Sequence, residues 1–360
     1  MRGLVVALCL TGCFFKPEPP GGTGDGSVLT GGVRKIVILR KPTSTLSQFP
    51  LSVYLENDLA LAASAAGAEN IAFRLSNGAP LPCEIVSYDP PSGSLEAWVQ
   101  APQLPLAGGF DLELVYGPTI LSSCAAPAVW SGYRGVWHFA EDVAGSSADS
   151  SVFKHDVVAG SGRPQPVVGR LGRALYFREL DADGADETCL STRTTLDFGT
   201  SSFSYDVWVN PEALLGAFDI ALIKGATSAG VPGFDLELGL DSWTGWIRDS
   251  GSGVNNVNPT DTASALVGMW SHLFVVVDRQ AGANAMRSYL NGILTDTDPL
   301  TTGSVNGTED LCFGTTSAPM RGSLDEVRLH ETARSADWIR TSYENIALRT
   351  QFMRLDPVPL

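Results

Sequence analysis

The feature that most constrains the fold is the alternation of apolar and polar side chains in short segments. Residues 203–210 read Phe-Ser-Tyr-Asp-Val-Trp-Val-Asn. Neighbouring side chains of a β-strand point to opposite faces, so Ser204, Asp206 and Trp208 should face away from the apolar residues between them. Similar segments recur after residue 33, and Asn291-Gly292 is typical of a two-residue hairpin turn. The pattern predicts an all-β protein.

The segment Trp130–Asp142 divides the chain into two parts. Pro, Ala and Ser are concentrated at residues 118–127 before it, and short alternating strands follow it. A length of 360 residues is also too long for one ordinary domain. We therefore expect two β-sandwich domains, a β-module at 33–130 and a second sandwich at 131–347.

Two segments have helical rather than strand character. Residues 58–68 are rich in Ala and Leu and predict a short helix. Near the C-terminus, Ser335 can cap a helix in which Ile339, Tyr343 and Ile346 form one apolar stripe. We expect this C-terminal helix to lie on the second sandwich, and residues 348–360 to form a frayed tail.

The N-terminus carries a targeting signal. Met1-Arg2 and the apolar run Gly3–Leu10 precede Leu10-Thr-Gly-Cys13, which resembles the lipobox of bacterial lipoproteins. The resemblance implies a signal peptide at 1–12, lipidation of Cys13 and a flexible tether at 13–32. An ordinary secretory leader is the alternative.

The expected location is the bacterial cell envelope, with the protein anchored by lipid. The absence of Asp after Cys13 favours the outer membrane, at its periplasmic or surface face. No later segment approaches the roughly 18 apolar residues of a spanning helix, so we expect membrane contact through the lipid anchor only.

The remaining cysteines suit an exported protein, in which disulfides are the default. They are Cys83, Cys124, Cys189 and Cys312. Four cysteines can pair in three ways. The domain boundary favours Cys83–Cys124 and Cys189–Cys312, one bridge in each domain. Zinc is the alternative, but the chain has no C-x-x-C motif.

Motifs in both parts resemble known families. Phe49-Pro50-Leu51, Asn70–Arg74, Leu81-Pro82, Trp98-Val99 and Leu114–Gly117 occur in an order that resembles the DUF2341 family, a bacterial extracellular β-module of unknown function.

In the second part, the motifs are Gly135–Phe139, Ala148–Ser150, Trp270–His272, Leu290–Gly292 and Leu324–Arg328 followed by Ala333–Ile339. They resemble a laminin-G-like, concanavalin A-like jelly roll, which implies that fold at 131–347.

Catalysis is not expected. Retaining glucanases of the resembled fold carry acids in an E-x-D-x-x-E spacing on a concave strand. The nearest segments here are Asp235-Leu-Glu237 and Asp111-Leu-Glu113, each without a third acid in register. We interpret both as solvated faces. The chain also has no G-x-S-x-G, H-E-x-x-H or phosphate-loop motif.

Calcium is the candidate cofactor. A loop at 181–187 offers closely spaced carboxylates of the kind that Ca²⁺ binds, from Asp181, Asp183, Asp186 and Glu187. Relatives of the resembled fold hold Ca²⁺ near the first and last strands, where Asp149 and Asp325 would lie. A solvated acidic surface is the alternative, so no ligand is assigned.

Aromatic and imidazole side chains give further candidates. Trp208, Trp243 and Trp246 are candidate sugar-stacking platforms, with core or rim packing as the default interpretation. The histidines are scattered and are interpreted as structural; they are His138, His155, His272 and His330.

Charge and fold together favour a binding function. The net charge of −15 argues against a nucleic-acid partner. We predict non-catalytic recognition of a glycan, or of an envelope or extracellular protein, in the manner of an adhesin. The alternative is a structural or assembly protein of the envelope, and a glycoside hydrolase ranks last.

Overall fold

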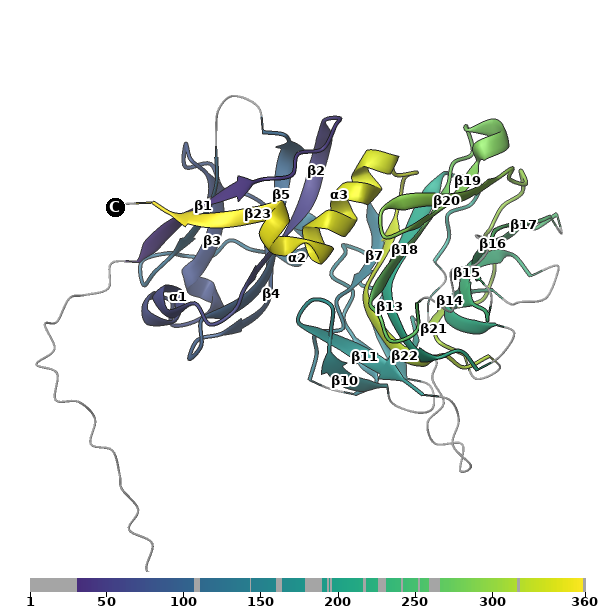
Figure 1. Ribbon diagram of the computed structural model, residues 1–360, viewed down its shortest axis with the longest axis horizontal. Helices are drawn as coiled ribbons and strands as arrows, with labels where there is room; N and C mark the ends of the chain where they lie inside the picture. The colour runs from purple at the N-terminus through teal and green to yellow at the C-terminus, as the bar shows by residue number, and fades with distance from the viewer. Residues whose placement is uncertain are drawn as a thin grey trace, which may run out of the picture.

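The computed structural model describes residues 31–358 except for 107–110, 143, 160–163, 179–189, 193, 195, 216–217, 226–230, 241, 252, 259–265 and 316–317. Its strands form antiparallel sheets of four, three, eight and eight strands. Figure 1 shows them in two bodies, with the C-terminal helix between the bodies. The predicted all-β class is confirmed.

The N-terminal module is a small sandwich. Its two sheets have the orders β23-β1-β6-β3 and β2-β5-β4. The strands are β1 (Gly32–Ile38), β2 (Leu46–Leu55), β3 (Ile71–Leu75), β4 (Cys83–Asp89), β5 (Ser94–Leu104), β6 (Leu112–Tyr116) and β23 (Met353–Pro357). Short helices connect them: α1 (Leu59–Ser64), η1 (Ala68–Asn70) and α2 (Ala126–Val129). Asp58 caps α1 by accepting from the Leu61 amide at 2.9 Å. A disulfide joins Cys83 to Cys124 with an S–S length of 2.05 Å.

The second body is a jelly roll of two large sheets. We call the first its inner sheet, with the order β10-β11-β22-β13-β18-β19-β20 and β7 paired to β22. Its strands are β7 (Tyr133–Trp137), β10 (Gln165–Val168), β11 (Arg173–Phe177), β13 (Phe203–Ala213), β18 (Ser271–Val277), β19 (Met286–Leu290), β20 (Ile293–Asp298) and β22 (Arg321–His330). The turn η3 (Gly282–Asn284) precedes β19.

The second sheet of the jelly roll is its outer sheet, with the order β17-β16-β15-β14-β21-β12-β9-β8. Its strands are β8 (Ser146–Ser147), β9 (Val157–Ala159), β12 (Leu190–Ser191), β14 (Asp219–Lys224), β15 (Gly233–Leu238), β16 (Trp243–Arg248), β17 (Val254–Val257) and β21 (Leu311–Phe313).

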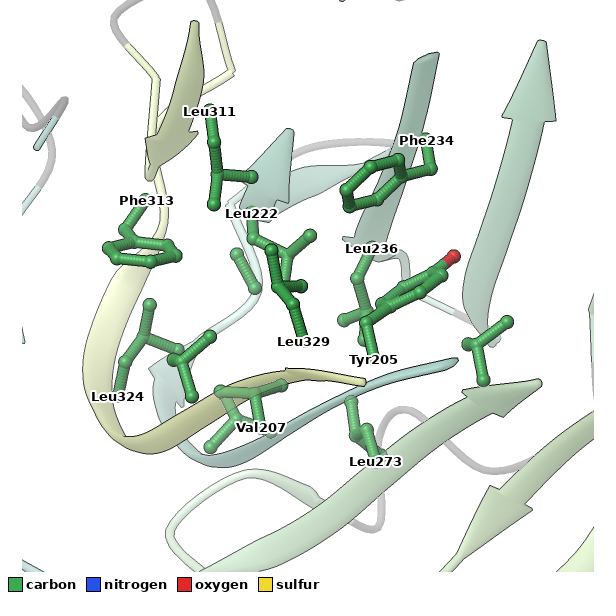
Figure 2. Packing of buried hydrophobic residues seen from close by; sticks show 14 of the residues in the cluster. Tyr205, Val207, Leu222, Phe234, Leu236, Leu273, Leu311, Phe313, Leu324 and Leu329 are labelled. Atoms are coloured by element: carbon green, nitrogen blue, oxygen red, sulfur yellow. The ribbon is translucent and has the colours of Figure 1, made fainter. Parts of the chain in front are cut away.

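The alternation predicted for residues 203–210 decides which side chains fill the jelly-roll core. Phe203, Tyr205, Val207 and Val209 are buried between the two sheets. Figure 2 shows Tyr205 beside Phe234 and Leu236 of the outer sheet, with Val207 in the same cluster. Burying an apolar side chain of this size contributes about 1.5–3 kcal/mol, so the core stabilises the sandwich strongly.

The C-terminal helix α3 (Ala336–Ala347) lies between the two bodies. Ser335 caps it as predicted, accepting from the Trp338 amide at 3.2 Å. Trp338 packs on Phe49 of the N-terminal module, with ring centroids 4.9 Å apart. Ile339 packs instead on the jelly roll, with Phe274, Val276 and Tyr289. The helix therefore ties the two bodies together.

The expectation of a frayed tail at 348–360 is wrong for the described residues. After α3 the chain forms α4 (Arg349–Phe352) and then β23, which pairs with β1 from Ile38↔Met353 to Arg34↔Pro357. Phe352 and Met353 are buried in the core of the N-terminal module. Both ends of the described chain thus belong to one sheet.

The structure does not test the lipoprotein prediction. Residues 1–30, which include Cys13, lie beyond the described residues. Within the described part of the chain, none of the helices combines the length and the apolar character needed to cross a membrane.

Candidate ligand-binding face

The face of the inner sheet turned away from the core is closed by the chain itself. Trp208 stacks on Tyr343 of α3, with centroids 5.7 Å apart, and Ile346 packs in the same cluster. This cluster also holds Trp98 and Trp130 of the N-terminal side. The central strands of this face are therefore covered by α3 and the N-terminal side.

A buried polar cluster around Asp206 lies on that closed face. The carboxylate of Asp206 accepts from His272 Nε2 at 2.9 Å, from His330 Nε2 at 2.6 Å and from Arg328 Nε at 3.1 Å. Burial opposes ionisation of Asp206, but Arg328 and the two histidines hold its pKa well below its usual range. Burial lowers the pKa of His330 to about 4. The cluster is therefore one carboxylate neutralised by one guanidinium, which suits a structural role.

A second buried cluster lies at the junction of the two bodies. His138 contacts Glu326 Oε1 through Nδ1 at 2.7 Å and Glu84 Oε2 through Nε2 at 3.3 Å. Glu84 belongs to the N-terminal module and also accepts from Ser150 Oγ at 2.6 Å. Burial opposes protonation of His138, but the two glutamates raise its pKa well above its usual range. The imidazolium therefore bridges two acids from different bodies.

The outer sheet presents the remaining large face. Because cross-strand partners share a face, the register defines one row of residues that point away from the core. The row runs Ser146, Val158, Ser191, Cys312, Ile223, Asp235, Trp246 and Asn256. We call this side of the sheet the outer face.

Charged and aromatic side chains from β15 and β16 meet on the outer face. Glu237 lies two residues after Asp235, and Arg248 two residues after Trp246. Trp246 Nε1 donates to Glu237 Oε2 at 2.8 Å. Arg248 pairs with Asp235, and its Cζ lies 5.3 Å from the Trp246 ring centroid. The four side chains form one connected group, which we call the outer-face cluster.

The interpretation of Asp235 and Glu237 as a solvated face is wrong. Asp235 is 0% exposed and Glu237 is 8% exposed. Burial raises the pKa of Asp235 to about 7, with Arg248 acting in the opposite direction. Burial also raises the pKa of Glu237. Alternation placed both acids on one face, but it could not show how closely their neighbours would cover them.

Three members of the outer-face cluster are nearly buried, since Asp235, Glu237 and Arg248 are 0%, 8% and 5% exposed, so a ligand would contact the cluster mainly through Trp246. Asp235 Oδ1 has no hydrogen-bond partner among the described residues, and Trp246 is half-buried. A carboxyl, a guanidinium and an indole face together offer donors, acceptors and an apolar surface. Asp235 and Glu237 have no third acid in register, which the E-x-D-x-x-E spacing of retaining glucanases requires, so the cluster does not match that catalytic arrangement.

The other candidates from the sequence are dispersed. Trp243 is buried in the core and Trp208 in the junction, as the default interpretation expected. Asp111 pairs with Lys35 at 2.7 Å and Glu113 with Arg74 at 2.8 Å, in the N-terminal module. His155 lies apart from the other histidines and contacts Thr194 Oγ1 at 2.8 Å.

The calcium candidates do not form a site in the described part of the chain. Asp149 accepts from the Val136 and His155 amides, at 2.9 and 2.8 Å. Asp325 accepts from the Leu171 amide at 2.9 Å. The described residues contain no group of three or more His, Cys, Asp or Glu side chains that could hold a metal ion. The candidates at 181–187 lie outside the described residues.

One cysteine of the second predicted disulfide, Cys189–Cys312, also lies outside the described residues. Cys312 is disulfide-bonded, and Cys189 falls among the residues that are not described.

Comparison with known proteins agrees with this architecture. Residues 183–340 match the Laminin_G_3 family model, described as the concanavalin A-like lectin/glucanases superfamily. This range covers most of the two jelly-roll sheets and the first part of α3. No curated protein matches the chain in sequence.

Solved structures resemble the chain at low identity. The binding domain of Paraclostridial Mosquitocidal Protein 1 is 14% identical, with a TM-score of 0.48, over 59% of this chain and 52% of that one. The botulinum neurotoxin serotype D ligand binding domain, solved with N-acetylneuraminic acid, is 12% identical, with a TM-score of 0.48, over 61% and 52%. This chain therefore spans about half the length of each of these toxin domains.

A third structure is matched over nearly its whole length. Domain 4 of AbnA, a GH43 extracellular arabinanase from Geobacillus stearothermophilus in complex with arabinotriose, is 20% identical, with a TM-score of 0.42, over 58% of this chain and 96% of that one.

Proposed function

We propose that this protein is a non-catalytic carbohydrate-binding protein, and that its jelly roll binds glycan through the outer face. The observation that carries the proposal is the asymmetry of the jelly roll. On the far side of the inner sheet, the central strands are covered by α3 and the N-terminal module. The opposite side carries the outer-face cluster.

The chemistry of the cluster suits a sugar. A pyranose ring has an apolar face that can lie against an indole, and its hydroxyls can both donate and accept. Trp246 supplies the aromatic surface, while Glu237 and Arg248 supply polar groups beside it. The family match to lectins and glucanases is compatible with either binding or hydrolysis. The lack of a third acid in register with Asp235 and Glu237 favours binding.

The test is a glycan array probed with the folded protein, with and without calcium. We expect saturable binding to a defined set of glycans. Trp246→Ala should weaken binding by at least about twofold to tenfold, because losing a stacking contact costs about 0.5–1.5 kcal/mol before lost hydrogen bonds are included. Phe153→Ala is the matched control, because Phe153 is an exposed aromatic residue that does not belong to the cluster.

Other outcomes separate the alternatives. A blank array together with capture of specific envelope proteins would favour the assembly role. Release of reducing sugar that is lost in Glu237→Gln would identify a hydrolase and refute the non-catalytic proposal. Binding that disappears with a chelator would establish calcium as a cofactor.

We also propose that the mature protein is anchored in the bacterial envelope by lipid on Cys13, as the lipobox-like Leu10–Cys13 implies. Labelled fatty acid should enter the wild-type protein and not the Cys13→Ser variant. The DUF2341-like order of motifs supports a proposal of the same kind for the N-terminal module. It implies an extracellular module and assigns it no ligand.

A further inference from the structure

The N-terminal module has a cavity where the C-terminal segment returns to it. The cavity measures about 240 Å³ and is lined by Arg34, Tyr54, Leu55, Arg349, Thr350, Met353, Arg354 and Leu355. Three of these residues are arginines and none is acidic. The chain as a whole is acidic, with a net charge of −15, whereas the lining of this cavity is basic.

The arginines differ in how far they are already neutralised. Arg34 pairs with Asp58 at 2.6 Å, and Arg354 pairs with Asp356 at 2.8 Å. Arg349 instead stacks on the ring of Tyr54, with its Cζ 4.3 Å from the centroid. Its Nη1 is buried and has no hydrogen-bond partner among the described residues. Unlike Arg34 and Arg354, Arg349 forms no ion pair with the described residues, so it is the lining arginine whose charge is available to an anion.

Other groups near Arg349 do not cancel its charge. Arg170 donates to the Ala347 carbonyl at 2.7 Å, and its pKa is lowered by burial and by the like charge of Arg349. Two acids lie nearby: Glu56, which hydrogen-bonds the Tyr54 side chain, and Glu96, whose pKa burial raises to about 7, so that Glu96 is largely protonated below neutral pH. With Glu96 protonated, Arg349 and Arg170 outnumber Glu56, so the surroundings remain positive in mildly acidic solution.

The rest of the lining is apolar. Met353 belongs to the core of the N-terminal module, and Leu55 and Leu355 are partly buried against that core. A planar guanidinium recognises carboxylate and phosphate oxygens by paired hydrogen bonds. We propose that this cavity binds a small organic anion, with its carboxylate or phosphate group at Arg349 and its apolar part over Met353 and Leu355.

This proposal is independent of the glycan proposal, because the cavity and the outer face belong to different bodies. It gives the N-terminal module a ligand class that the sequence did not suggest. The site also depends on the C-terminal segment, because Arg349 and Met353 reach the module only through α4 and β23.

The test is calorimetric titration of the full-length protein with phenyl phosphate, benzoate, inorganic phosphate and benzyl alcohol at constant ionic strength and pH 6. We expect phenyl phosphate and benzoate to bind, inorganic phosphate to bind at least several-fold more weakly, and benzyl alcohol not to bind. Phosphate binding as strongly as phenyl phosphate would refute the apolar half of the site.

Substitutions of Arg349 test whether this residue is the cation that binds the anion. Arg349→Ala should reduce affinity for phenyl phosphate at least tenfold, and Arg349→Lys should give an intermediate loss because it keeps the charge but not the planar fork. Arg321→Ala is the control, since Arg321 pairs with Glu212 at 2.7 Å on the jelly roll. Equal affinities for wild type and Arg349→Ala would overturn the proposal.

A second measurement locates the ligand in the wild-type protein, without the Arg349→Ala variant. In wild-type protein labelled with fluorotyrosine, phenyl phosphate should shift the Tyr54 resonance, identified by its loss in Tyr54→Phe. The resonance of Tyr289, on the jelly roll, should stay in place. Shifts confined to jelly-roll tyrosines would place the ligand elsewhere and refute the site.

Discussion

Glu96 gives the sharpest test of how the two bodies are held together. It lies on β5 and is 2% exposed at the junction. Burial raises its pKa to about 7 from an ordinary value of 4.5; Glu326 and Glu84 act in the same direction, and His138 and Arg349 oppose them. This difference in pKa corresponds to about 3 kcal/mol.

The sign follows from proton linkage. Between pH 4.5 and 7 the folded protein keeps a proton on Glu96 that the unfolded chain has released, so stability falls as pH rises. Its contribution is fully present below the unfolded pKa and is lost as pH rises through about 7. Glu96→Gln is neutral at every pH and should therefore remove this loss.

The expected result is a difference between wild type and variant that depends on pH. Glu96→Gln should match wild type near pH 4 and exceed its unfolding free energy by about 3 kcal/mol near pH 8.5. Urea unfolding followed by tryptophan fluorescence measures this, because Trp98 and Trp130 pack in the same junction. Glu309→Gln, at an exposed position, is the control and should show no such trend. A constant difference at both pH values, or a less stable variant at pH 8.5, would refute the reasoning.

Three further predictions concern stability. Deleting residues 348–360 should destabilise the N-terminal module by about 3–6 kcal/mol, because Phe352 and Met353 leave its core; its urea midpoint measures this. Replacing Cys83 and Cys124 by Ser should cost about 4 kcal/mol, because the bridge spans 41 residues, and reducing agent should abolish the difference between wild type and variant. Asp206→Asn should cost about 3–5 kcal/mol, because Arg328 would remain buried without its carboxylate; thermal unfolding should show it, and an unchanged midpoint would contradict the structural role of the cluster.

The sequence predicted the features that local periodicity controls. Alternation at 203–210 identified the core side of β13, and the capped apolar stripe identified α3. Asn291 and Gly292 have positive φ values of 52° and 80°, as the predicted hairpin turn requires. Each of these depends on residues within about a dozen positions of one another.

The features that the sequence did not predict depend on distant partners. Met353–Pro357 carries Arg, Asp and Pro and resembles a polar tail, but β1 stabilises it as a strand from the opposite end of the chain. The burial of Asp235 and Glu237 likewise depends on the register of β15 with β16, which brings Trp246 and Arg248 beside them. The two-residue spacing of Asp235 with Glu237, and of Trp246 with Arg248, already indicated that each pair shares a face. Without knowledge of the strand pairing, however, this pattern also fits a solvated face.

The junction determines which surface the jelly roll can offer. Trp208, Tyr343 and Ile346 close one sheet against the N-terminal side, and His138 joins acids from both bodies in the same region. Separating the bodies would expose these aromatic rings and leave a buried histidine and its acids without partners, which is costly. The junction therefore should persist while ligand binds, and the outer face should act as a rigid surface held away from the N-terminal module. If the pair of bodies instead opened on binding, Trp98 and Trp130 fluorescence would change with glycan, whereas a ligand on the outer face should leave it unchanged.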